Sequence, residues 1–265
     1  MSIYLKTEDE IELMRRANSL VSRTLGIVGK NIKPGVSTKQ LDEIAETFIR
    51  DNGGEPLFKN FPNPLGKPFP ASICTSVNDV VVHGIPSDSD VLRDGDIISV
   101  DCGVKIGGYC GDACYTFGVG EISGDTRRLL TATKEALSAA IATATTGHRL
   151  GDVSHAIQQS AEKNGYSVVR PLTGHGIGRE MHEEPQVRNY GSEGSGPMLK
   201  TGMCIAIEPI LTAGSPKVML MHDRWTIRTA DGGLAAHYEH TIAIRRGQAE
   251  ILSSFAEAEQ QERTH

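Results

Sequence analysis

The chain has 265 residues, of which 38% are apolar, enough for one domain or for two half-domains that share a core. Its formal net charge of −6 argues against nucleic-acid binding, because nucleic-acid-binding proteins are usually basic. The sequence contains no apolar run long enough to span a membrane, and acidic residues stand near its start where a signal peptide would be apolar. We therefore expect a cytoplasmic protein that binds neither nucleic acid nor membrane.

Two amphipathic helices are predicted at the start of the chain. Thr7 and Glu10 form a capping box, and apolar residues follow them at helical spacing. Ser37 and Gln40 form a second capping box before a shorter helix that ends at an Asn-Gly-Gly sequence. A loop rich in Pro, Asn and Phe is expected over residues 57–70.

The order of helices and strands then repeats. Strand-like runs cover residues 72–77, 79–85, 96–104 and 109–119. Helices are predicted over residues 125–146 and from Asp152 to residue 163, followed by strand-like runs at 166–172, 203–211, 226–230 and 237–244. Two helices followed by strands thus occur twice. We predict one domain over residues 1–252, with similar halves at about 1–122 and 123–252, and a frayed polar tail over 253–265.

The five cysteines predict neither a disulfide framework nor a structural zinc site. Their number is odd, and no C-x-x-C pair is present. Most of them stand inside apolar runs, which is typical of reduced, buried thiols. The residues concerned are Cys74, Cys102, Cys110, Cys114 and Cys204.

Two aspartates interrupt neighbouring strand-like runs. If the hairpin between them is centred between Ile106 and Gly107, Asp101 and Asp112 lie directly opposite each other on one face. Opposed residues have Cβ atoms about 4.5–5.5 Å apart, and two carboxylates at that distance repel each other. A cation or a shared proton is therefore expected between them.

Two further carboxylates and one imidazole extend this set. Glu208 and Glu239 each stand in or beside an apolar run of the second half, and His175 lies in a Gly-His-Gly-Ile-Gly sequence. Each residue alone could be a strand-edge residue, a turn cap or half of an ion pair. Four carboxylates together balance two divalent ions, which form a recurrent hydrolytic site when they are about 3.5–4 Å apart. This ligand set allows Co, Mn, Fe(II), Zn or Ni, and the sequence does not choose among them.

Six short motifs resemble those of the methionine aminopeptidases. They are VHGIP, SVDCGV, GDACYTF, GHGIGREMHEEP, AIEP and HYEHT, and their order and spacing match from near the N-terminus to about residue 255. The short interval between His175 and Glu208, and the lack of a Cys/His-rich segment before the first helix, resemble the bacterial type I form. The resemblance implies the α/β pita-bread fold, an α+β arrangement of two pseudo-symmetric halves around a central curved antiparallel sheet.

The resemblance also implies a function. A metalloaminopeptidase of this family removes the N-terminal methionine of nascent proteins and peptides, prefers a small second residue, and uses attack by a hydroxide that bridges two metal ions. The expected partners are nascent polypeptide N-termini, also at the ribosome, and the expected oligomeric state is a monomer. The implied metal ligands are Asp101, Asp112, His175, Glu208 and Glu239.

The remaining roles follow from the same resemblance. His83 would contact the scissile amide nitrogen, His182 would donate a hydrogen bond to the carbonyl oxygen, and Glu208 would also move a proton. The methionine pocket would include Phe69, Cys74 and Trp225, with plain packing as the alternative for the two aromatic residues.

Four positions depart from the family pattern and predict a less aromatic, roomier pocket. They are Gly66, Phe69, Leu172 and Met181. Methionine specificity is thus a weaker expectation than hydrolysis.

Two other functions remain open from the sequence. One is an Xaa-Pro aminopeptidase or creatinase-like hydrolase of the same fold, which usually carries a large additional N-terminal domain. The other is a non-catalytic pita-bread protein that binds other macromolecules. Such a protein would be free to lose metal ligands, and here all five are retained.

Overall fold

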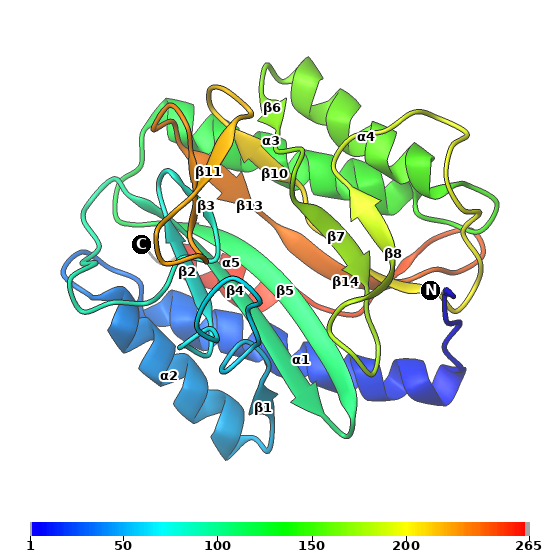
Figure 1. The fold of residues 1–265 in the computed structure, drawn as a ribbon, viewed down its shortest axis with the longest axis horizontal. Helices are drawn as coiled ribbons and strands as arrows, with labels where there is room; N and C mark the ends of the chain where they lie inside the picture. Colours follow the sequence, from blue (N-terminus) through cyan, green and yellow to red (C-terminus); the bar gives the residue numbers. More distant parts are fainter. Residues whose placement is uncertain (1, 263–265) are drawn as a thin grey trace.

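A computed structural model describes residues 2–262 (Figure 1). The first half contributes two helices and five strands: α1 (Glu8–Asn31), α2 (Thr38–Asp51), β1 (Glu55–Pro56), β2 (Cys74–Val77), β3 (Val80–Val82), β4 (Ile97–Ile106) and β5 (Tyr109–Gly118). The second half repeats the order with α3 (Gly124–Thr143), α4 (Leu150–Lys163), β6 (Ser167–Val168), β7 (Thr173–Gly176), β8 (Glu183–Arg188), β9 (Cys204–Ile207), β10 (Ile210–Thr212), β11 (Val218–Leu220), β12 (Ile227–Thr229), β13 (Ala235–His237), β14 (Glu239–Ala243), β15 (Glu250–Ile251) and α5 (Ala256–Glu262). The predicted boundary between the halves, after residue 122, remains a prediction.

Within residues 2–262, the central sheet has nine strands, and all of their pairings are antiparallel. The strand order is β1-β4-β5-β14-β9-β7-β8, with β2 paired to β4 and β15 paired to β14. In the view of Figure 1, α1 and α2 lie below the central strands and α3 and α4 lie above them, so that strands from both halves meet in the middle. The predicted fold class, two similar halves around a central antiparallel sheet, is confirmed.

The helix starts follow the predicted capping residues in the first half. The side chains of Thr7 and Ser37 each accept a backbone hydrogen bond from the third helical residue, and both capping boxes are complete. In the second half the prediction that Asp152 opens α4 is wrong. The helix begins at Leu150, and the Asp152 carboxylate reaches back to accept a hydrogen bond from the Arg149 backbone N–H at 2.6 Å.

The hairpin of β4 and β5 differs from the prediction by two residues. Asp101 pairs with Cys114, and Asp112 pairs with Gly103, so the aspartates are diagonal neighbours and are not directly opposite. The turn consists of Gly107 and Gly108, whose φ angles of 60° and 82° suit a two-residue hairpin turn. Because the shift is even, both carboxylates remain on one face of the sheet, which is what the metal hypothesis needs.

The predicted frayed tail is wrong for residues 253–262. Phe255 stacks on the His240 ring with centroids 3.7 Å apart, and Ala258 is fully buried. An added Cβ at Gly26 of α1 would lie 2.6 Å from the Glu257 Cβ, so α5 packs closely on α1. The tail docks through a few apolar residues although its composition is polar. Residues 263–265 lie outside the described part of the chain.

The cysteines agree with the prediction, because all five are free and buried. None of the helices within residues 2–262 is both long enough and apolar enough to cross a bilayer.

Candidate metal centre

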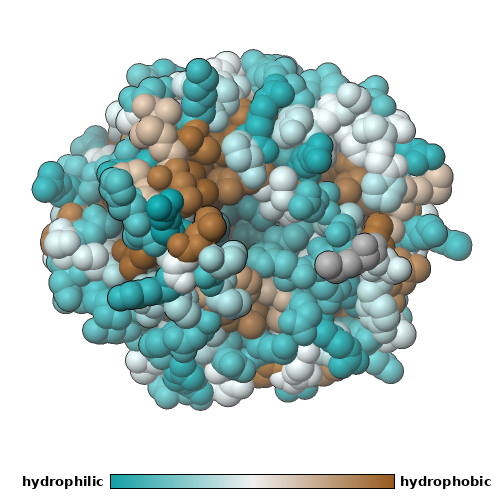
Figure 2. Space-filling model, viewed as in Figure 1, coloured by the Kyte–Doolittle hydropathy of each residue, from teal (hydrophilic) through white to brown (hydrophobic). Residues whose placement is uncertain are grey.

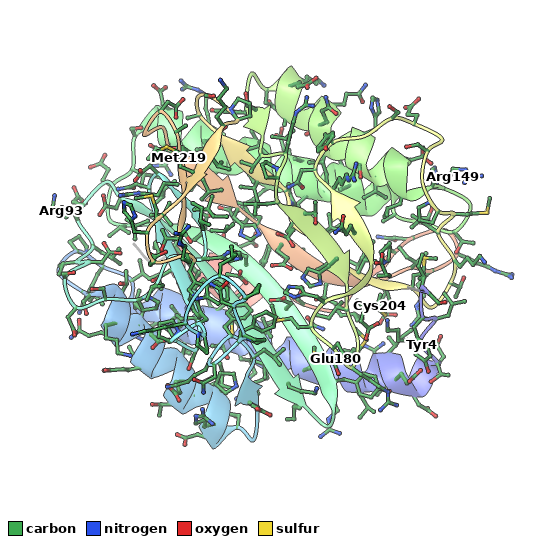
Figure 3. The ribbon with its side chains drawn as sticks, in the orientation of Figure 1. Tyr4, Arg93, Arg149, Glu180, Cys204 and Met219 are labelled. Carbon is green, nitrogen blue, oxygen red and sulfur yellow. The ribbon has the colours of Figure 1, made fainter. Side chains whose placement is uncertain are left out.

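A cavity of about 270 Å³ opens on the face of the molecule shown in Figures 1 and 2. Hydrophilic side chains line the hollow at the centre of Figure 2, and hydrophobic ones gather beside it. The residues predicted to bind metal, to act in catalysis or to contact the substrate all line this cavity: Phe69, Cys74, His83, Asp101, Asp112, His175, His182, Glu208, Trp225 and Glu239. The side chains of the molecule are drawn in Figure 3.

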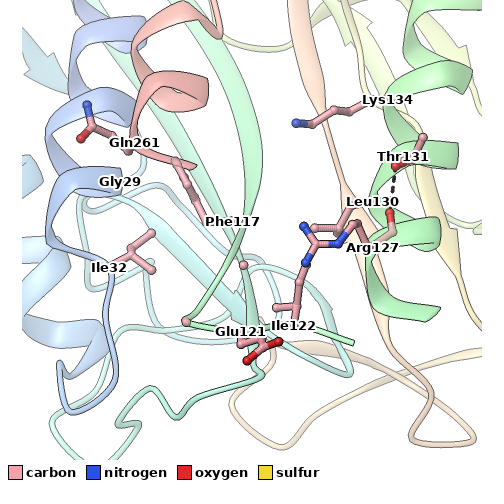
Figure 4. A pocket seen from close by; sticks show the side chains of 12 residues that line it. Gly29, Ile32, Phe117, Glu121, Ile122, Arg127, Leu130, Thr131, Lys134 and Gln261 are labelled. Atoms are coloured by element: carbon pink, nitrogen blue, oxygen red, sulfur yellow. Dashed lines mark hydrogen bonds between the residues drawn. The ribbon is translucent and has the colours of Figure 1, made fainter. Parts of the chain in front are cut away.

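A second hollow, of about 540 Å³, lies between α1, α5 and α3 (Figure 4). It contains Phe117 and Leu130 beside the basic residues Arg127 and Lys134. Glu121 is the one acidic side chain among its described lining residues. This hollow therefore does not offer the carboxylate cluster that a metal hydrolase needs.

The candidate ligands come from neighbouring strands of the central sheet. Asp101 lies in β4, Asp112 in β5, His175 in β7 and Glu239 at the start of β14. Glu208 was expected inside a strand, and that prediction is wrong. It lies in the break between β9 and β10, directly before Pro209, whose missing N–H interrupts the ladder.

The ligand atoms converge closely. Donor atoms of Asp112, His175 and Glu239 all lie within 4.8 Å of one another. The His175 Nε2 atom is 3.7 Å from Asp112 Oδ2 and 3.9 Å from Glu208 Oε1. The other ring nitrogen of His175, Nδ1, donates to the Gly176 carbonyl oxygen at 2.9 Å, which leaves Nε2 with a free lone pair facing the acids.

The acids of the cluster resist ionisation in the absence of a cation. Burial raises the pKa of Asp101 to about 7. Burial raises the pKa of Asp112, Glu208 and Glu239 well above their usual values, and repulsion from neighbouring carboxylates adds to each shift. Burial lowers the pKa of His175 to about 3, so its imidazole is neutral at pH 7 and available as a ligand.

Several polar atoms in the cluster have no hydrogen-bond partner among residues 2–262. They are Asp101 Oδ1, Asp112 Oδ1, Glu239 Oε1 and His237 Nε2, all buried. No Lys or Arg of the described chain forms an ion pair with the five candidate ligands. Unpartnered buried carboxylates are costly, and a divalent cation would satisfy them. Four carboxylates and a neutral imidazole are also a donor set that suits such ions, so these residues fit a divalent metal.

Three more histidines face the cavity. His83 follows β3 with a φ of 56°, an unusual conformation for a residue other than glycine, and burial lowers its pKa to about 4. His182 contacts His175 edge-on with ring centroids 4.4 Å apart. His237 was missed in the sequence, and its Nε2 lies 3.8 Å from Glu208 Oε2. A signal for it was present, because it stands two residues before Glu239.

The apolar part of the cavity only partly matches the prediction. Phe69 packs edge-on against Trp225 with centroids 5.2 Å apart, and Trp225 Nε1 donates to the Lys67 carbonyl oxygen at 2.8 Å. Met181 lines the cavity as well.

Two predicted pocket positions are not part of the lining. Gly66 lies against Arg224, and Leu172 packs in a separate apolar cluster with Val81 and Val169. Phe58 and Phe61, which were not predicted, line the cavity. For Gly66, Phe58 and Phe61 the prediction failed because the irregular loop over residues 57–70 has no periodicity from which side-chain direction could be read.

Buried carboxylates and a neutral imidazole around one cavity define a class of metal-dependent hydrolases. Comparisons with known proteins narrow this class. The model of metallopeptidase family M24 matches residues 12–246. The chain is 50% identical to a methionine aminopeptidase from Clostridium acetobutylicum over 95% of this chain and 98% of that one. It is 48% identical to methionine aminopeptidase 1 of Bacillus subtilis over 95% of this chain and 99% of that one.

Solved structures agree with the sequence relatives. Methionine aminopeptidase from Thermotoga maritima matches with a TM-score of 0.92 at 41% identity, covering 96% of this chain and all of that one (100%). A prolidase from Pyrococcus furiosus, at 22% identity and a TM-score of 0.76, shares the fold and is covered to 65% of its length. The chain therefore belongs to the methionine aminopeptidases of metallopeptidase family M24, and this favours the first functional interpretation over the Xaa-Pro alternative.

Proposed function

We propose that the enzyme removes methionine from the N-termini of nascent proteins and peptides, with two divalent ions held by Asp101, Asp112, His175, Glu208 and Glu239. The observation that carries this proposal is the set of buried, unpartnered carboxylate oxygens that face one cavity. Four anionic side chains match the charge of two divalent ions, whereas one ion would leave two negative charges uncompensated in a buried site.

The metal ions, when bound, would supply an acidic water near neutral pH and polarise the peptide carbonyl. Glu208 would accept the proton of the attacking water, and its position in the lining of the cavity supports this role. His182 would donate a hydrogen bond to the carbonyl oxygen as negative charge develops there. His83 would contact the amide nitrogen of the leaving peptide.

The apolar end of the cavity would hold the methionine side chain. Phe69 and Trp225 pack edge-on there, with their ring planes at 78°, and Cys74 lines the same space. A thioether makes favourable contacts with aromatic rings, and a flexible unbranched side chain can fill an irregular pocket. The cavity is small, at about 270 Å³, and the residue after the methionine must lie at its mouth. This supports a preference for peptides whose second residue is small.

We also propose that the enzyme works as a cytoplasmic monomer on chains that emerge from the ribosome. The net charge of −6 does not favour direct binding to RNA, so contact through the nascent chain itself is the simpler arrangement.

A peptide panel with controlled metal content tests the proposal. Met-Ala-x, Met-Lys-x, Met-Pro-x and N-acetyl-Met-Ala-x peptides are incubated with metal-free protein and with protein supplied with Mn(II), Co(II), Fe(II), Zn(II) or Ni(II). We expect cleavage of Met-Ala-x only after metal is added, and at least one ion that restores the rate. Native mass spectrometry of the active sample should show two bound ions per chain. Full activity of the metal-free protein, or equal cleavage of all four peptides, would refute the proposal.

A further inference from the structure

The turn between β7 and β8 carries two residues that line the cavity, Met181 and His182. This turn is short and irregular, and one side chain organises its backbone. Glu183 Oε1 accepts hydrogen bonds from the backbone N–H groups of Arg179 at 2.9 Å and Glu180 at 3.3 Å. The residue directly after His182 therefore closes the turn on itself.

The second oxygen of that carboxylate bonds to a lysine far away in the sequence. Lys6 Nζ lies 2.6 Å from Glu183 Oε2, with the lysine side chain 1% exposed and the glutamate side chain 19% exposed. Within residues 2–262, Glu183 is the one acid that pairs with Lys6. A buried ion pair adds stability only with good geometry and additional hydrogen bonds, both of which are present here.

The backbone on both sides of this ion pair is fixed. The Lys6 N–H donates to the Gly202 carbonyl oxygen at 2.7 Å. An added Cβ at Gly178 would lie 2.5 Å from Lys6 Cε and 2.6 Å from Glu183 Oε1, so the turn packs directly on the lysine stem. Figure 3 shows Glu180 of this turn, Tyr4 and Cys204 at the same corner of the molecule. The segment before α1 thus clamps the turn from outside the cavity.

His182 itself has few contacts that could hold its ring. The residue is exposed at the mouth of the cavity, and its ring has edge contacts with His175 at 4.4 Å and Phe61 at 5.4 Å. Its position must therefore come mainly from the backbone of the turn. Effective catalysis requires such groups to be held to within a fraction of an ångström, and small displacements reduce the rate strongly.

We propose that Lys6 and Glu183 are positioning residues for His182, acting through the backbone of the turn at residues 177–182. This inference rests on the proposed role of His182 as a hydrogen-bond donor. Neither side chain lines the cavity, so neither is expected to contact the substrate.

A double-mutant cycle tests the inference. Lys6→Met, His182→Ala and the double variant are compared in Met-Ala-x cleavage, with bound metal measured in each. Arg15→Met serves as a control, because Arg15 forms an ion pair between α1 and a distant acid, Glu250, without contact to the turn. We expect Lys6→Met to lower kcat roughly 10–100-fold at unchanged metal content, and to cause no further loss when His182 is already alanine. Arg15→Met should leave kcat unchanged.

The outcomes separate this inference from the proposed function. A normal rate for His182→Ala would refute the role of His182, and with it the positioning role of Lys6 and Glu183. If His182→Ala lowers kcat and Lys6→Met does not, only the positioning role of Lys6 and Glu183 is overturned. Equal losses from Lys6→Met in both backgrounds would also overturn it, because the lysine would then act by another route.

Two conservative variants keep the test decisive if Lys6→Met does not fold. Lys6→Arg retains the charge and should recover part of the rate. Glu183→Gln retains an acceptor for the turn N–H groups but loses the ion pair, and should replace Lys6→Met in the same cycle. In the metal-free protein, the His182 ring resonances should shift in Lys6→Met or Glu183→Gln and stay in place in Arg15→Met. Unchanged His182 resonances would overturn the inference.

Discussion

Two groups of acidic side chains in this enzyme have the same chemistry and opposite pKa shifts. A hydrogen bond from the Tyr109 hydroxyl, 2.6 Å long, is the main reason that the pKa of Glu10 is lowered to about 2. A hydrogen bond from Lys59 similarly lowers the pKa of Glu46 to about 2. In the metal centre, burial raises the pKa of Asp101 to about 7 and that of Asp112 well above its usual value.

The difference lies in what surrounds each carboxylate. Glu10 and Glu46 have donors that stabilise their negative charge, so they stabilise the folded protein as anions. Asp101 and Asp112 each keep one buried oxygen without a partner among the described residues. Carboxylates in that situation require a proton or a cation. The enzyme therefore folds around an arrangement that is unfavourable until metal binds, which is a common cost of a preorganised site.

The largest effect should come from a substitution that separates activity from stability. Asp112→Asn removes one metal ligand, so we expect kcat to fall roughly 1000-fold or more; it also removes a buried carboxyl group that must take up a proton when no metal is bound. The same change should stabilise the metal-free protein by about 1 kcal/mol. In a domain of this size that raises the Tm by about 2–4 °C. Peptide cleavage and thermal unfolding of the metal-free sample measure the two effects.

Glu46→Gln is the matched control for this prediction. It removes a carboxylate that has donors, so the Tm should fall while cleavage stays normal. If Asp112→Asn lowered the metal-free Tm as Glu46→Gln does, the contrast between the two groups of acids would be wrong.

Metal binding should stabilise the enzyme substantially. An ion that binds only the folded chain adds about 2.7 kcal/mol at a concentration 100 times its Kd. For a domain of this size that corresponds to a Tm increase of about 5–10 °C. Thermal unfolding with and without Mn(II) measures it, and the increase should shrink in Asp112→Asn. A Tm that does not respond to any divalent ion would contradict the metal-centre interpretation.

A smaller effect is expected from pH. Asp101 has an unfolded-state pKa of about 3.8 and a folded-state pKa of about 7, so the folded protein binds more protons between those values. The metal-free protein should therefore lose stability as pH rises from about 4 to 7. Glu10 and Glu46 act in the opposite sense, but their contribution is lost only as pH falls from about 4.5 towards 2.

Thermal unfolding of metal-free protein at pH 5 and pH 7.5 tests this dependence. The Tm should be higher at pH 5, and Asp101→Asn should reduce the difference. With saturating metal the order should reverse, because ligands must be deprotonated to bind. A metal-free Tm that rises from pH 5 to pH 7.5 would show that the raised pKa values do not control stability in this range.

The direction of the side chains that line the metal centre is more predictable from the sequence in strands than in loops. Side chains alternate along a strand, so the face of Asp101 and Asp112 was correct even though their register was wrong by two residues. His237 ends β13, two residues before Glu239 starts β14, and it also lines the cavity; the charge argument used for the acids does not extend to an imidazole. The motifs and the family resemblance supplied the rest of the ligand set.

Loop geometry could not be read in the same way. Gly66 and Phe61 stand in one Pro-rich segment, and the sequence gives no period that would show which of them faces the cavity. The docking of Phe255 on His240 likewise depends on a contact between segments, which composition alone does not encode. The uncertain part of the prediction was thus the substrate pocket, where specificity is decided.

The pocket prediction with the smallest expected effect concerns Trp225. Trp225→Phe keeps an aromatic ring against Phe69 but loses the hydrogen bond from Nε1 to the Lys67 carbonyl oxygen, 2.8 Å long. Such a bond contributes about 0.5–1.5 kcal/mol, so we expect KM for Met-Ala-x to rise roughly 2- to 10-fold while kcat and metal content stay unchanged. Steady-state kinetics measure this split. Because the loop over residues 57–70 contributes to the pocket and not to the ligand set, a fall in kcat without a change in KM would mean that the loop also positions the catalytic groups.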